Sequence, residues 1–218
     1  DYLIKPEGYN IPFDAERIHG ISTELAAQEG HDLSEILEKF NIALSQSKYI
    51  VGQNVGFDVN IMGCEFHRFG IATDLTKMPV LDTCTETTAL LLKLPGGRGG
   101  RFKLPTLTEL HQYLFNKPFS EAHNATADVE ATTRCFLELI RREIFTKEEL
   151  DVPLSYFKEF QEQNPNEIQL IGLKHINLKV ASEKIRQQLQ ALQSDYITPT
   201  VSASDKKDLK EARFAHLH

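Results

Sequence analysis

Two short apolar runs constrain the fold most, because a continuous apolar run of roughly 4–8 residues is typical of a strand buried on both faces of a sheet. They occupy residues 49–52 and 79–83, and the second ends in a carboxylate followed by a threonine. Apolar residues at helical spacing follow both runs, over residues 58–70 and 85–94. The alternation of strands and helices predicts an α/β fold with a buried parallel sheet.

The remaining segments extend this pattern. Residues 2–5 are typical of the end of a strand. Ser22 is expected to be the N-cap of a short helix, and residues 32–45 have apolar residues at helical spacing. Further helices are expected from Thr106, as N-cap, to about residue 115, and over about 127–142. After about residue 145 the sequence becomes more polar, which predicts three units. They are a domain over residues 1–145, a helical extension over 146–193 with helices at 147–163 and 180–192, and a polar linker over 194–218.

Composition limits the classes of function. The chain of 218 residues is 41% hydrophobic and 25% charged, so it can form a buried core. Its formal net charge of −7 argues against a stable, non-specific duplex-DNA binder, because phosphate contacts dominate such binding. The acidic balance is compatible with a nuclease that engages a strand end through bound metal ions.

The three cysteines, Cys64, Cys84 and Cys135, have no CxxC spacing, which argues against a disulfide framework and a zinc site. They are expected to be small buried apolar residues in a reducing cytoplasm. No apolar run approaches the roughly 20 residues of a membrane span, and no signal peptide is recognisable. We therefore expect a cytoplasmic protein with no membrane partner.

Asp58 follows the first apolar run at the point where the chain turns into a helix. Ligands of open α/β sheets bind at the carboxyl edge of the strands, and a carboxylate there can bind Mg²⁺ or Mn²⁺. An ordinary helix N-cap is the alternative.

His123 and Asp128 lie five residues apart, where a loop passes into a helix. An imidazole is suited to removing a proton from water near neutral pH, and a carboxylate on a helix can hold a metal ion beside it. A surface histidine and an acid favoured by the helix dipole are the alternatives for the two residues.

Taken together, four segments resemble the DEDDh 3′–5′ exonucleases, and in particular the proofreading epsilon-like members. The resemblance covers about residues 1–145. The segments are Asn54 with Phe57 and Asp58 as the second motif, residues 123–128 as the third motif His-x4-Asp, residues 17–22 with their His-Gly-Ile, and Asp82 with Thr83 at a strand end.

This resemblance implies a ribonuclease-H-like fold, in which helices flank a mixed sheet, and two bound Mg²⁺ or Mn²⁺ ions. Asp58 and Asp128 would be metal ligands and, with the general base His123, catalytic residues. The substrate would be the 3′ end of a single-stranded or frayed DNA.

Contacts with nucleic acid are expected from two places. In the segments that carry the resemblance, Phe57 would pack against the terminal bases, with Asn54 and His19 nearby. In the glycine-rich loop of residues 93–103, Arg98, Arg101 and Lys103 would contact phosphates. A solvated linker between two helices explains that loop equally well.

The family's first motif, an Asp-x-Glu on the first strand, is expected some tens of residues before Asp1. We therefore expect that the N-terminal strands are missing and that the chain by itself has negligible exonuclease activity. At the other end, His216 and His218 resemble the opening of a PHP domain, as found in alpha subunits of DNA polymerase III. That subunit is accordingly an expected partner, in cis or in trans.

Two alternatives remain open. One is an exonuclease-like domain that has lost activity and serves as a binding or scaffold module in a polymerase assembly. The other is an exoribonuclease with the same chemistry at RNA 3′ ends.

Overall fold

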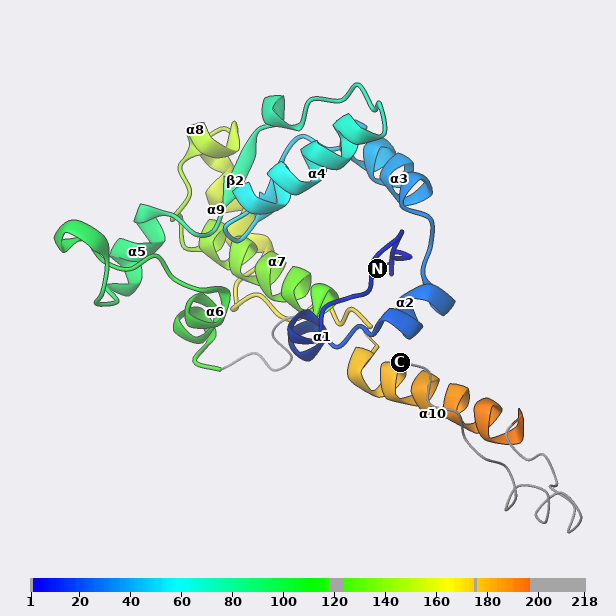
Figure 1. The fold of residues 1–218 in the computed structure, drawn as a ribbon. Helices are drawn as coiled ribbons and strands as arrows, with labels where there is room; N and C mark the ends of the chain where they lie inside the picture. Colours follow the sequence, from blue (N-terminus) through cyan, green and yellow to red (C-terminus); the bar gives the residue numbers. More distant parts are fainter. Residues whose placement is uncertain (1, 118–123, 175, 197–218) are drawn as a thin grey trace, which may run out of the picture.

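The computed structural model describes residues 2–117, 124–174 and 176–196 (Figure 1). The elements in chain order are α1 (Phe13–His19), α2 (Thr23–Glu29), α3 (Leu33–Ser45), β1 (Ile50–Gly52), α4 (Gly56–Arg68), η1 (Leu75–Lys77), β2 (Val80–Asp82), α5 (Glu86–Leu92), η2 (Arg98–Gly100), α6 (Leu107–Phe115), α7 (Ala125–Arg141), α8 (Lys147–Leu150), α9 (Ser155–Gln163) and α10 (Leu178–Tyr196). The predicted α/β class is confirmed, in a helix-rich form.

β1 and β2 form a parallel pair in which Val51 lies opposite Leu81. A parallel bridge between Ile4 and His31 stands apart from them, and no further strand occurs in the described residues. Leu81 is buried, but Val51 is 39% exposed and Val80 is 42% exposed. The prediction that these strands are buried on both faces was wrong, because Val51, which shares a face of the sheet with Leu81, and Val80, on the other face, are both exposed.

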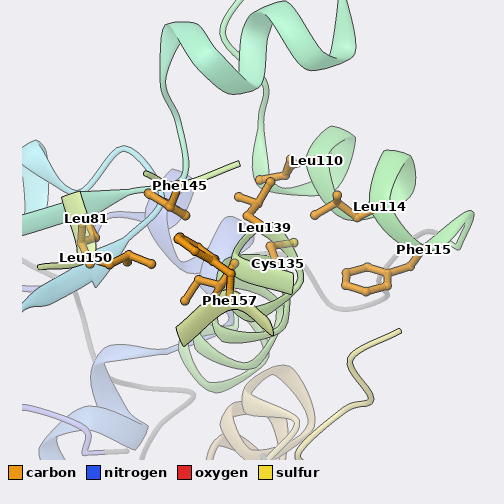
Figure 2. Packing of buried hydrophobic residues seen from close by; sticks show 10 residues of the cluster. Leu81, Leu110, Leu114, Phe115, Cys135, Leu139, Phe145, Leu150 and Phe157 are labelled. Carbon is orange, nitrogen blue, oxygen red and sulfur yellow. The ribbon is translucent and has the colours of Figure 1, made fainter. Parts of the chain in front are cut away.

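The main core lies on α7 (Figure 2), which packs against α6, α9 and β1. Leu110 and Leu114 come from α6, and Leu139 from α7. Phe157 comes from α9, so residues on both sides of position 145 share one core. A second cluster joins α3, α4 and η1 through Leu37, Leu44, Phe66 and Leu75.

Local capping signals were read correctly. The Ser22 side chain accepts a hydrogen bond from the Leu25 N–H, and Thr106 forms a capping box with Glu109. The helix expected over residues 147–163 was wrong in one respect. It is divided into α8 and α9 because Asp151 adopts a left-handed conformation (φ 49°) two residues before Pro153.

The cysteines differ in exposure. Cys135 is buried, and burial raises the pKa of its thiol to about 12. Cys84 is half-buried and Cys64 is exposed, so the expectation of three buried cysteines was wrong. In the described part of the chain, no helix is both long and apolar enough to cross a membrane.

Candidate functional site

The loop before α4 is a tight turn that begins at Gly52. A Cβ atom at Gly52 would lie 2.6 Å from the Val55 side chain, so a larger residue does not fit there. Asn54 follows in the left-handed region (φ 56°), which asparagine tolerates better than most residues. The two residues together let the chain leave β1 and enter α4 within a few residues.

Asp82, at the end of β2, holds this turn in place. Its carboxylate accepts hydrogen bonds from the backbone N–H groups of Asn54 (2.8 Å), Val55 (3.0 Å) and Cys84 (2.7 Å). The neighbouring Thr83 is fully buried and donates to the carbonyl oxygen of Gly52. Sequence reasoning noted Asp82 and Thr83 as a strand end and for their resemblance, and missed that Asp82 holds the turn that enters α4.

Asp58 is the third residue of α4 and is exposed. The N-cap position belongs to Val55, so the alternative that Asp58 is the N-cap was wrong. Phe57 lies beside it with 69% of its surface exposed. The first turn of α4 therefore presents a carboxylate and an aromatic ring to solvent.

The start of α7 carries the second predicted carboxylate. Asn124 is the N-cap, and its side-chain oxygen accepts from the N–H groups of Thr126 (3.1 Å) and Ala127 (3.3 Å). Asp128 lies half-buried in the first turn, and its N–H donates to the Asn124 carbonyl oxygen (2.8 Å). The predicted base, His123, lies outside the described residues.

His19 is the last residue of α1 and is half-buried. Its Nδ1 accepts a hydrogen bond from the Ile21 N–H at 3.0 Å. In the neutral ring, the proton must then be on Nε2, which can donate to a ligand.

Two of the predicted cationic residues form ion pairs within the chain. Arg101 pairs with Glu86 at 3.1 Å on the surface. Lys103 donates to Glu109 at 2.6 Å, and this bond, followed by that from the Thr106 N–H, lowers the pKa of Glu109. Arg98 is exposed. A phosphate would have to compete with these carboxylates for Arg101 and Lys103.

The donor set for a metal can be judged from Asp58 and Asp128. Carboxylate oxygens suit Mg²⁺, which is commonly held by one or two carboxylates together with substrate phosphates. Over residues 2–117, 124–174 and 176–196, no group of three or more His, Cys, Asp or Glu side chains is arranged to hold a metal ion. Asp14 and Glu16 do not provide a substitute, because they lie in α1 and Glu16 is bound to Arg186 at 2.8 Å.

Comparison with known families places most of the chain in one of them. The family model RNase_T, described as Exonuclease, matches residues 1–136 of the 218. The matched range contains both turns described above and ends within α7. No curated protein matches the chain.

Proposed function

The chain belongs to the exonuclease family, and from this premise we propose that it is a 3′–5′ exonuclease module that releases mononucleotides from DNA ends. The observation that carries the proposal is the pair of aspartates, Asp58 and Asp128, each in the first turn of its helix. Phe57 adds an exposed aromatic ring beside one of them, as a site for strand ends needs.

Asp58 and Asp128 would hold divalent ions, Mg²⁺ or Mn²⁺. When bound, these ions would lower the pKa of a water molecule and would stabilise the negative charge that develops on the phosphate. The Phe57 ring stacks against the terminal base and separates it from its neighbour. His19 donates from Nε2 to the terminal nucleotide.

His123 is the general base in this proposal. It removes a proton from a water molecule whose oxygen forms the new bond to the terminal phosphorus. The bond from phosphorus to the 3′ oxygen of the preceding nucleotide breaks, and that oxygen takes up a proton. The products are a nucleoside 5′-monophosphate and a strand shortened by one nucleotide with a free 3′ hydroxyl.

The test is His123→Ala in the protein at its natural length, with single-stranded DNA labelled at its 5′ end. The unchanged protein should give a ladder of labelled strands that shorten from the 3′ end in Mg²⁺ or Mn²⁺. The variant should lose about 10²- to 10⁴-fold in turnover, because it lacks the base, and retain its affinity for DNA.

His67→Ala is the matched control, since His67 is an exposed histidine on α4 outside the proposed site. It should leave turnover unchanged. Full turnover by the His123 variant would remove the base from the proposal. A preference for RNA over DNA 3′ ends would transfer the same chemistry to an exoribonuclease.

A scaffold role is the second candidate. It is favoured by the observation that, in the described residues, no three or more His, Cys, Asp or Glu side chains are arranged so that they could hold a metal ion. In that case, the partner would be an alpha subunit of DNA polymerase III, in cis or in trans, as proposed from His216 and His218, which lie outside the described residues. Tight binding to that subunit without any hydrolysis would support this candidate.

A further inference from the structure

The connection between α9 and α10 is held along α7 by three buried charged side chains. Glu130, Arg134 and Glu138 are four residues apart and so share one face of the helix. Glu138 accepts from the Ile168 N–H at 3.1 Å, and Arg134 donates to the Ile168 carbonyl oxygen at 2.7 Å. Glu130 accepts from the Gly172 N–H. This contact follows α7 back toward its N-terminus.

The same connection reaches the start of α7 at Asn124. While the Asn124 side-chain oxygen caps α7, its Nδ2 donates to the Ile176 carbonyl oxygen at 3.1 Å. One residue later, the Asn177 side chain accepts from the Val180 N–H and so caps α10. The turn that leads to Asp128 is therefore bonded directly to the segment that begins α10.

α10 then docks on the turn that follows His19. Ser182 is 3% exposed; its hydroxyl donates to the Gly20 carbonyl oxygen at 2.7 Å and accepts from the Ser22 N–H at 3.0 Å. The approach is close, because a Cβ at Gly20 would lie 2.9 Å from the backbone nitrogen of Lys179. Gly20 also has φ 79°, so glycine is required there for two reasons.

We propose that residues 168–174 and 176–182, hereafter the strap, fix the His19 turn relative to the start of α7, and that Ser182 is a positioning residue for the reaction. This inference rests on the proposed function. The Ser182 hydroxyl binds the Gly20 carbonyl oxygen and the Ser22 N–H, which are the backbone groups on either side of Ile21. The Ile21 N–H in turn donates to the His19 ring and so orients it. The strap lies outside the part of the chain that the family model matches, so it adds to the matched domain.

The first experiment measures amide hydrogen exchange in the 218-residue chain. Ser182→Ala removes the acceptor of the Ser22 N–H, so exchange at Ser22 should be about tenfold faster. Ser34→Ala, an exposed serine on α3, is the matched control and should change nothing at Ser22. If Ser182→Ala does not fold, Ser182→Cys keeps the volume with a weak donor and acceptor. Unchanged exchange at Ser22 would overturn the strap.

The second experiment measures single-turnover hydrolysis in the protein at its natural length. Ser182→Ala should lower the single-turnover rate constant about fivefold with the Kd for DNA unchanged, because the His19 ring is misplaced rather than lost. Added to His19→Ala, the same change should cost nothing further, because both act through one group. Additive losses would overturn the positioning role.

The two experiments separate this inference from the proposed function. If the unchanged protein hydrolyses no 3′ end, both the proposed function and the positioning role of Ser182 are overturned. The exchange result would in that case still decide whether the strap holds the His19 turn.

Discussion

α7 is held along its length, whereas α4 is held at two separate places, at Phe66 in the second core cluster and at the turn before its first residue. α7 buries apolar side chains on one face and the charged Glu130, Arg134 and Glu138 on another. In α4, all of whose residues the structure describes, Phe66 is the only fully buried residue. Its start depends on Asp82, a residue of a different element.

This difference separates two ways of fixing a carboxylate. Asp128 stays in place because the helix that bears it is packed against the core along its length. Asp58 stays in place because one carboxylate from β2 accepts the first free N–H groups before α4. Loss of an anchor should therefore unfold the protein in the first case and loosen a single turn in the second.

The largest effect is expected for Glu138→Gln. Glu138 is fully buried and accepts from Arg141 (2.6 Å), Arg142 (2.8 Å) and the Ile168 N–H. Glu138→Gln leaves Arg141 and Arg142 without this acceptor, and both arginines are partly exposed, so the free energy of unfolding in urea should fall by about 3 kcal/mol, the lower end of the range for a broken buried pair. Glu162→Gln removes the exposed pair with Lys158 and should cost less than about 0.5 kcal/mol. Equal costs would contradict the distinction between buried and exposed pairs.

The loss of stability in Glu138→Gln should depend on pH. Burial raises the pKa of Glu138, but the bonds from Arg141, Arg142 and Ile168 outweigh it, so the net pKa lies below the usual 4.5. A lowered pKa means that the stabilisation is complete above pH 4.5 and is lost as the pH falls through the pKa of the folded state. The gap in unfolding free energy between the two proteins should be constant from about pH 6 to 8 and should narrow in acid. A gap that widens in acid would contradict a lowered pKa of Glu138 in the folded state.

Asp82→Ala should have the next largest effect. It removes the acceptor of three N–H groups, so we expect a loss of about 2–3 kcal/mol in unfolding free energy. Exchange should become faster at Asn54 and Val55, while the amides of α7 keep their protection relative to global unfolding. Asp74→Ala is the control, because Asp74 caps only the short η1 and should cost about 0.5–1 kcal/mol. Faster exchange spread evenly over α7 would show that the two helices are not anchored separately.

The smallest effect on stability is expected for Asn54→Gly. Glycine adopts the left-handed φ of 56° without strain but loses more entropy on folding, so the change should stay within about 0.5 kcal/mol. The backbone N–H that donates to Asp82 is retained. If the Asn54 side chain contacts the 3′ end of the DNA, titration with single-stranded DNA should show that Asn54→Gly binds it more weakly while its stability is unchanged. Unchanged affinity would remove Asn54 from the proposed interface.

Sequence patterns predicted what depends on neighbours in the chain. The caps at Ser22 and Thr106 and the helix over residues 32–45 were confirmed, because each needs only residues a few positions away. The role of Asp82 could not be predicted in this way, since its partners lie 27 and 28 residues earlier. The strap was missed for the same reason, because Ser182 and its hydrogen-bond partner Ser22 lie 160 residues apart in the sequence. Asp58 and Asp128 were placed in first helical turns as expected, while their metal-binding role stays a prediction.

The four-residue spacing of Glu130, Arg134 and Glu138 has a consequence for how such chains can diverge. One residue inserted between Glu130 and Glu138 would turn the later part of α7 by about 100° and move Glu138 off the strap. Related sequences that keep the strap should therefore tolerate no insertion or deletion in this interval. The glycine-rich loop of residues 93–103 lies on the surface and should vary freely in length. An insertion or deletion in this interval would then mark relatives that lack the strap.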